Sequence, residues 1–300
     1  MTFYEQLDAL YKEGNHEKIE TFLLDALRDF TLIHNDAMVI ATFNELGAFF
    51  RGISQYERAE RYFEESMALL AKMGMQVSKQ FAGVLLNYAG CFRFAGQLEK
   101  AEEQFLKAKL IFEHLDAQQD YEYVSLLNNL ALVYMDQGKV SQALEMADQA
   151  LAIVREMDDA EHEIATSLNN VAAMYLNLQQ YDKAEALLRE ALAVYDAMPE
   201  ANVHHAAALN SLAFLYVRQG KYPQALDLLQ RAAEKNQFFF GENCDQARIY
   251  SGIASVQQIL GDKPAAALYQ QKAVSIFSRQ LGNNHPTTLQ AQERLAQYQK

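Results

Sequence analysis

The sequence repeats itself every 40 to 42 residues, and this period constrains the fold more than any single residue does. One position per period is held by Ile19, Ala59, Ala101, Ala143, Ala184, Ala225 and Ala266. A second series, of small residues, consists of Gly47, Ala89, Ala131, Ala172, Ala213 and Ala254. A fixed period of this size is typical of a solenoid, in which each repeat buries its apolar face only against its neighbours. We therefore expect a chain that binds rather than catalyses.

Residues 127–150 show how one repeat is built. Apolar residues recur at steps of three and four in two segments, as they do on one face of a helix. The first segment carries Leu127, Leu130, Ala131 and Tyr134, and the second carries Val140, Ala143, Leu144, Ala147 and Ala150. Gly138 lies between them and predicts a helix end in the left-handed conformation. Each repeat is therefore predicted to be two antiparallel helices joined by a tight turn.

The same turn is punctuated by glycine in five repeats, at Gly14, Gly96, Gly138, Gly220 and Gly261. Ser54 and Gln179 replace this glycine in two repeats, so we expect a different turn conformation there. Pro223 and Pro264 follow their glycines by three residues, which suits the first turn of a helix.

No linker or charge block interrupts the period, so we predict a single solenoid domain over residues 1–300. The predicted repeats cover residues 2–36, 37–78, 79–120, 121–161, 162–202, 203–243 and 244–284. The first repeat is short, with Phe3–Glu13 as its opening helix. A final helix over 286–299, rich in polar residues, is predicted to cap the array.

Composition excludes several classes of function. A net charge of −13 argues against nucleic acid and against an anionic membrane surface as partners. Two cysteines, Cys91 and Cys244, cannot form a disulfide framework, and Cys91 is predicted to be a buried small hydrophobe. The N-terminal residues lack the pattern of a signal peptide, and we expect a cytoplasmic protein without a membrane span.

Sequence motifs for catalysis are not found. The chain holds none of the phosphate-binding glycine loops, nucleophile elbows or zinc-protease motifs. The seven histidines do not cluster at ligand spacing; adjacent His204 and His205 would point about 100° apart on a helix. We predict no active site, no metal and no cofactor.

Leu130, Ala131, Tyr134, Gly138 and Ala143, with their counterparts in the other repeats, resemble the tetratricopeptide repeat pattern. The repeats are longer than the ordinary 34 residues or so. Leu127-Asn-Asn-Leu-Ala131 and the linker Leu281-Gly-Asn-Asn-His-Pro-Thr287 resemble the kinesin light chain type. The resemblance implies an all-α, right-handed superhelical solenoid of antiparallel helix pairs. It also implies a concave groove, lined by the first helices, that receives peptides.

Helical spacing then selects the groove side chains. In the first helix of a repeat, the face opposite the apolar stripe contains the position of Asn129. Its counterparts in two other repeats are Asn87 and Asn170. An amide both donates and accepts hydrogen bonds, so these three residues could pair with the backbone of an extended peptide, as groove asparagines do in the resembled families. Alternatively they bond within the solenoid.

Further groove positions suggest selectivity for the ligand. Arg218 and Arg248 would favour an acidic side chain or a carboxylate on the peptide, or are ordinary solvated arginines. Phe94 and Phe214 could offer apolar pockets or pack against neighbouring repeats, and Asn177 shares the groove position of Phe94. The predicted partner-binding residues are thus Asn87, Asn129, Asn170, Arg218, Arg248, Phe94, Asn177 and Phe214.

Two other functions remain open at this stage. A peptide-responsive switch would compact on binding and change its affinity for another protein. A structural scaffold would form a homo-oligomer through the apolar segment Phe238–Phe240. The partner expected for the groove is a peptide or a disordered protein segment.

Overall fold

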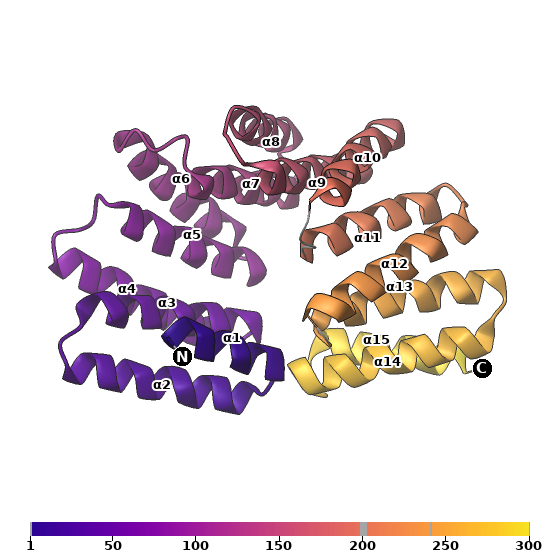
Figure 1. Cartoon of the computed structure of the whole chain (residues 1–300), viewed down its shortest axis with the longest axis horizontal. Coiled ribbons are helices and arrows are strands. Elements are labelled where there is room, and N and C mark those ends of the chain that lie inside the picture. Colours follow the sequence, from indigo (N-terminus) through magenta and orange to yellow (C-terminus); the bar gives the residue numbers. More distant parts are fainter. Residues whose placement is uncertain (1, 199–202, 241, 300) are drawn as a thin grey trace. The chain divides into compact units, whose positions relative to one another are not determined.

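The computed structural model describes residues 2–198, 203–240 and 242–299. In these ranges the chain is entirely α-helical, with no strand, as the repeat pattern predicts (Figure 1). The helices are α1 (Phe3–Glu13), α2 (His16–Leu32), α3 (Asp36–Gly52), α4 (Tyr56–Lys72), α5 (Lys79–Phe94), α6 (Leu98–His114), α7 (Tyr121–Asp136), α8 (Val140–Arg155), α9 (Glu161–Asn177), α10 (Tyr181–Ala197), α11 (Val203–Arg218), α12 (Tyr222–Phe240), α13 (Cys244–Leu260), α14 (Lys263–Leu281) and α15 (Pro286–Tyr298).

The helices group into two compact units, Met1–Asp158 and Asp159–Lys300. In the first unit each helix pair packs on the next, so that α2 contacts α3, α4 contacts α5 and α6 contacts α7. The second unit follows the same rule from α10 to α15. First helices of consecutive repeats also touch one another, as α9 and α11 do. A surface made of first helices is therefore built into each unit.

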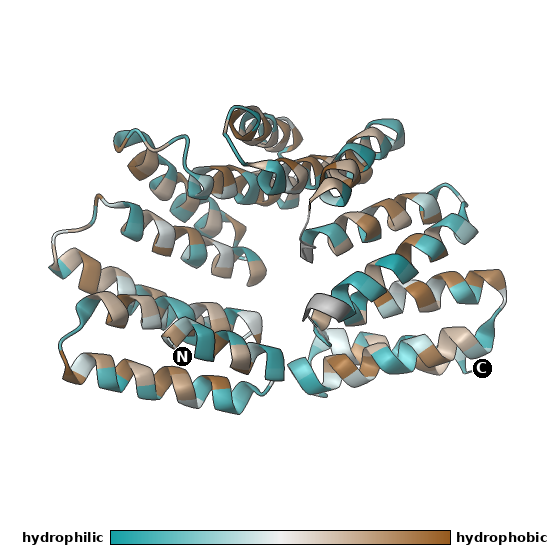
Figure 2. Ribbon diagram, in the orientation of Figure 1, coloured by the Kyte–Doolittle hydropathy of each residue, from teal (hydrophilic) through white to brown (hydrophobic). Residues whose placement is uncertain are grey.

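The predicted apolar stripes form the core. Leu127, Leu130 and Ala131 have no exposed surface, and Tyr134 is also buried. Hydrophobic residues alternate with polar ones along each helix, because only one face of each helix is covered by its neighbours (Figure 2). In the described part of the chain, no helix combines the length and apolar character needed to cross a membrane.

The turn between the two helices of a repeat is the same with and without glycine. Gly138 has φ 75°, and the expectation of a different turn at Ser54 and Gln179 is wrong, because they have φ 62° and 58°. A backbone hydrogen bond explains why the turn has the same shape with and without glycine. Lys139 N–H donates to the Tyr134 carbonyl at 2.8 Å, and Gln180 N–H donates to the Tyr175 carbonyl at 2.9 Å. This closing bond requires a left-handed residue whatever its side chain.

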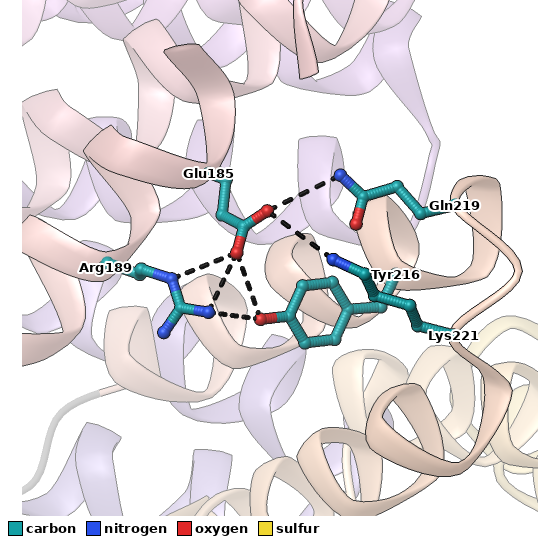
Figure 3. Close-up of polar contacts among 5 residues, drawn as sticks. All are labelled: Glu185, Arg189, Tyr216, Gln219 and Lys221. Atoms are coloured by element: carbon teal, nitrogen blue, oxygen red, sulfur yellow. Dashed lines mark hydrogen bonds and ion pairs between the residues drawn. The ribbon is translucent and has the colours of Figure 1, made fainter. Parts of the chain in front are cut away.

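Glu185 on α10 ties that helix to the next repeat (Figure 3). Its carboxylate accepts hydrogen bonds from Arg189 at 2.8 Å and from the Tyr216 hydroxyl at 3.2 Å. The Gln219 amide donates to it at 3.5 Å, and Lys221 Nζ lies 4.0 Å away. Since the last three residues lie on α11 and the turn after it, the cluster fixes α10 against the end of α11.

An equivalent cluster occurs in residues 1–158. Glu102 on α6 accepts hydrogen bonds from Gln137 Nε2 at 2.9 Å and Lys139 Nζ at 2.8 Å. Burial by itself raises the pKa of Glu102, but these hydrogen bonds outweigh it and the pKa is lowered. The charged carboxylate is thus the form that holds the two helix pairs together.

Candidate partner-binding site

The first helices of residues 159–300 enclose a pocket of about 490 Å³ on their shared surface. Its apolar part is made by Leu176 of α9, Phe214 and Val217 of α11, Leu229 of α12 and Val256 of α13. Its polar part is made by Asn177, Asn210, Ser211, Ser255 and Arg294. A mainly apolar pocket with a few polar groups is the usual composition of a site that binds a ligand side chain.

Phe214 and Arg218 form a pair beside this pocket. They are one helical turn apart on α11, and the guanidinium carbon of Arg218 lies 4.9 Å from the centre of the Phe214 ring. The ring is 45% exposed although it is large and apolar. No carboxylate of the described residues pairs with Arg218, so its charge is available to a ligand.

A second pocket, of about 340 Å³, adjoins the first and is cationic. The two share Gly252, Ser255 and Arg294. Arg248 lines the second pocket and is paired with Asp245 at 2.5 Å. Arg294 of α15 contributes to both pockets and, within the described ranges, has no acidic partner. An acidic partner for Arg294 would have to come from a bound molecule.

Comparison with known proteins gives the family. A model described as the tetratricopeptide repeat matches residues 122–197 and 204–279, which together are more than half of the chain. The chain belongs to the tetratricopeptide repeat family. A comparison of the sequence with curated proteins gave no match.

Solved structures with the same repeat architecture resemble this tetratricopeptide repeat protein. A chain of the APC/C hetero-tetramer Cut9–Hcn1 has TM-score 0.63 at 17% identity, over 98% of this chain and 48% of that one, so this chain spans about half of it. BtubC from P. vanneervenii has TM-score 0.58 at 23% identity, over 79% and 93%. Repeats of a kinesin light chain from Podosopora anserina have TM-score 0.53 at 21% identity, over 66% and 95%. At these identities the likeness shows the fold alone.

The structure brings several of the expected residues of this tetratricopeptide repeat protein together. Asn177 and Phe214 line the apolar pocket, Arg218 lies against Phe214, and Arg248 lines the cationic pocket. Asn170 is on the same helix as Asn177 and is half-buried. Its side chain makes no hydrogen bond with the described residues, so both its donor and its acceptor are open.

The predicted groove asparagines of the first unit already make hydrogen bonds within the chain. Asn87 donates a hydrogen bond from Nδ2 to Asn44 Oδ1 at 3.1 Å, and Asn129 donates from Nδ2 to the Ser125 carbonyl at 2.9 Å. Each amide keeps a carbonyl oxygen that no described residue contacts by a hydrogen bond. These bonds within the solenoid are the alternative that the sequence left open.

Phe94 lies exposed between two cations. Its ring is 60% exposed, with the guanidinium carbons of Arg51 and Arg93 at 5.9 and 5.8 Å from the ring centre. Arg93 is paired with Asp136 at 2.8 Å, whereas Arg51 donates to the backbone carbonyl of Asn87 at 3.4 Å. The aromatic face is therefore held open at the surface rather than packed against a neighbouring repeat.

Sequence reasoning missed Arg294 and undervalued Asn210. Arg294 belongs to the predicted capping helix, and Asn210 lies about 60° from the centre of the predicted groove by helical spacing. Both line the apolar pocket. The signal for Arg294 was the presence of an arginine on a first helix of an acidic chain. For Asn210 no signal separated it from the other asparagines next to the groove.

The remaining sequence expectations concern Cys91, the metal-ligand side chains and the segment Phe238–Phe240. Cys91 is fully buried, as expected, and burial raises the pKa of its thiol to about 11. No group of three His, Cys, Asp or Glu side chains in the described ranges is arranged to hold a metal ion. The side chains of Phe238–Phe240 lie outside the described residues, so the expected contact for self-association is not placed.

Proposed function

We propose that the chain binds an extended peptide, or a disordered segment of a partner protein, along the first-helix surface of residues 159–300. Tetratricopeptide repeat arrays are protein-interaction modules, and family membership assigns the chain to that class. The finer proposal concerns the ligand. An apolar side chain would fill the pocket at Phe214, and an acidic group next to it would pair with the adjacent arginines.

One observation carries this proposal: two arginines without an acidic partner flank an apolar pocket in a chain of net charge −13. Arg28 and Arg58 are paired with carboxylates, and Arg61 has no acidic partner in the described ranges, so a missing partner marks a binding site only beside a pocket. Arg218 and Arg294 are instead left open beside exposed apolar surface. A peptide that carries an apolar residue and a carboxylate complements both features.

The groove asparagines would add backbone recognition. Asn170 has both amide groups open, and Asn87 and Asn129 each have an open carbonyl oxygen. An open oxygen accepts a hydrogen bond from a peptide N–H, and an open N–H donates to a peptide carbonyl. Their proposed role is therefore to hold the ligand backbone, whereas the two arginines select its charge.

The test is a selection from a random peptide display library with the full chain as bait, followed by affinity measurements on the enriched peptides. Wild type is expected to enrich peptides that combine an apolar residue with Asp or Glu. Arg218→Ala and Arg294→Ala should each weaken the best peptide about tenfold or more, because a charge-assisted hydrogen bond is lost.

Arg61→Ala is the matched control, because Arg61 is exposed, lies on α4 of the other unit and has no acidic partner among the described residues. It should bind the peptide like wild type. If all three variants bind equally well, or if wild type enriches no peptide, the proposed function is wrong.

A further inference from the structure

A third, smaller pocket lies at the edge of the proposed peptide site. It has a volume of about 110 Å³ and is lined in part by Asn210 of α11, Asn236 of α12 and Arg248 of α13. It shares Asn210 with the apolar pocket and Arg248 with the cationic pocket. A ligand that occupies those two pockets would therefore pass the opening of the third.

The side chain at the base of this pocket is that of Asn236, which is polar, whereas the equivalent residues of other repeats are apolar. Asn236 is 1% exposed, and the neighbouring Gln246 has no exposed surface. The positions equivalent to Asn236 in other repeats hold Leu70, Phe112, Val154, Tyr195 and Phe277. Burying an amide in place of these side chains has a cost unless all its groups are hydrogen-bonded. Packing alone does not account for the asparagine.

The hydrogen bonds around Asn236 fix which way its amide faces. Asn243 Oδ1 caps α13 by accepting from the Gln246 backbone N–H at 2.8 Å. Asn236 Nδ2 donates to this same oxygen at 3.0 Å and to Gln246 Oε1 at 2.8 Å. Both hydrogens of the Asn236 amide are thus used. Turning the Asn236 amide over would set its oxygen against Asn243 Oδ1, which the helix cap commits as an acceptor, so the cap determines the orientation.

This orientation leaves a buried acceptor without a donor. Asn236 Oδ1 has no hydrogen-bond partner among the described residues. Asn210 lies at the same pocket, is half-buried, and makes no side-chain hydrogen bond to any described residue. The pocket therefore offers one buried acceptor and one open amide that can donate.

The charges at the opening restrict what can enter. Asp245 and Arg248 line the pocket and are paired with each other at 2.5 Å. A carboxylate could not donate to Asn236 Oδ1 and would be repelled by Asp245. The paired Asp245 and Arg248 leave no net negative charge to balance an ammonium group. A neutral group that both donates and accepts satisfies the pocket. A primary amide does so with separate donor and acceptor atoms, whereas a hydroxyl has to use one oxygen for both.

We propose that this pocket is a specificity subsite for the carboxamide of an Asn or Gln residue in the bound segment. The ligand NH₂ donates to Asn236 Oδ1, and the ligand oxygen accepts from Asn210 Nδ2. The proposal rests on the proposed peptide-binding function and adds a neutral amide to the apolar and acidic groups that the ligand carries. A site with a buried hydrogen-bonding group discriminates strongly against a ligand that leaves the group unpaired.

The experiment repeats the display selection with wild type, Asn210→Ala and Asn236→Leu as full-chain baits. Wild type is expected to enrich Asn or Gln at one fixed peptide position. Replacing that peptide residue with Ala should weaken binding to wild type about tenfold and binding to either variant about twofold or less. Asn177→Ala lines the apolar pocket but not the small one, and it should keep the amide preference.

Three results would overturn the inference. Enriched peptides without an amide preference would leave the peptide-binding function standing and refute the amide subsite. An amide preference that persists in both variants would place its cause elsewhere. A wild-type bait that enriches no peptide would refute both proposals together. Asn210→Ala keeps the test valid if Asn236→Leu fails to fold, since Asn210 makes no hydrogen bond within the described structure.

Discussion

Asn236 donates a 2.8 Å hydrogen bond to Gln246 at the repeat position where Phe112 packs against Tyr123 with ring centres 6.1 Å apart. A later repeat has Tyr195 stacked on His205 at 5.4 Å. One pair of core positions is thus aromatic in one repeat, mixed in a later repeat and fully polar in the repeat that follows it. Since the backbone is the same in all three, the polar pair is a local choice of side chains rather than a requirement of the fold.

A double-mutant cycle tests the cost of the polar pair. Asn236→Leu alone should lower the free energy of unfolding by about 1–3 kcal/mol, because it leaves Gln246 Oε1 buried without a donor. Adding Gln246→Leu should recover most of this loss, because the unpaired groups are then removed together. Urea unfolding of the two single variants and the double variant gives the coupling energy. Additive losses would contradict the arrangement described here.

Glycine should stabilise the turn at Gln179. A non-glycine residue in the left-handed region costs about 1 kcal/mol or more, and Gln179 has φ 58°. Gln179→Gly is therefore expected to raise the melting temperature, and the converse change Gly138→Ala should lower it. Calorimetry on both variants measures the effect. A loss of stability in Gln179→Gly would show that its side chain contributes more than its backbone costs.

Protonation of His205 should destabilise the fold in mild acid. Burial lowers the pKa of His205, and the charge of Lys235 lowers it further; Asp196 opposes this and Arg231 adds to it. Asp196 Oδ1 lies 3.3 Å from Nε2 without the alignment of a hydrogen bond. Because the unfolded chain binds this proton at a higher pH, stability is full above about pH 6.5 and falls as the pH drops towards the lowered pKa.

The variant His205→Phe isolates this contribution, because phenylalanine can stack on Tyr195 as the imidazole does. Denaturant unfolding between pH 7 and pH 5 should show a smaller loss of stability in the variant than in wild type. His204, whose pKa burial also lowers, is unchanged in the variant and accounts for part of the remaining slope. Identical pH slopes for the two proteins would rule out a role for His205.

Glu185 should make the second unit sensitive to stronger acid. Burial raises the pKa of Glu185, but hydrogen bonds from Arg189 and Gln219 outweigh it and the pKa is lowered. Its stabilising effect is therefore present above the ordinary carboxylate pKa and is lost as the pH falls through the lowered value. Glu185→Gln should lower the melting temperature at pH 7 and flatten its dependence on acid.

The control for Glu185 is Glu103→Gln. Glu103 pairs with Lys107 on the surface of α6, and its side chain is 59% exposed. An exposed pair of this kind contributes little to stability, so the melting temperature of the control should stay close to that of wild type at pH 7 and in acid. Equal effects of the two substitutions would show that the cluster in Figure 3 does not fix α10 against α11.

The repeat pattern predicted the helices well and the turns incompletely. The opening helix Phe3–Glu13 has the predicted bounds, and the last helix begins at the predicted Pro286. The turn at Ser54 was predicted wrongly because glycine preference was taken as the cause of the left-handed conformation. The closing hydrogen bond from Gln55 N–H to the Phe50 carbonyl, at 2.8 Å, is the actual cause.

The candidate site could be predicted in part. Counting at 100° per residue identified Asn177 and Phe214, which do line one pocket. It could not identify Arg294, because the side chain comes from α15 and reaches the pocket only through the packing of one helix on another. Nor did it identify Asn236, whose position on a second helix is predicted to be core whatever residue occupies it.

The sequence by itself determined that this chain is an all-helical tetratricopeptide repeat array, because helix pairing and turn placement depend on residues within one period of about 41. Only the tertiary structure decided which polar groups are satisfied. Whether Arg218 has a carboxylate partner, or Asn236 a donor for its oxygen, depends on side chains brought together from different helices. Periodicity shows which face a residue is on, whereas the recognition chemistry proposed for this protein depends on contacts across that face.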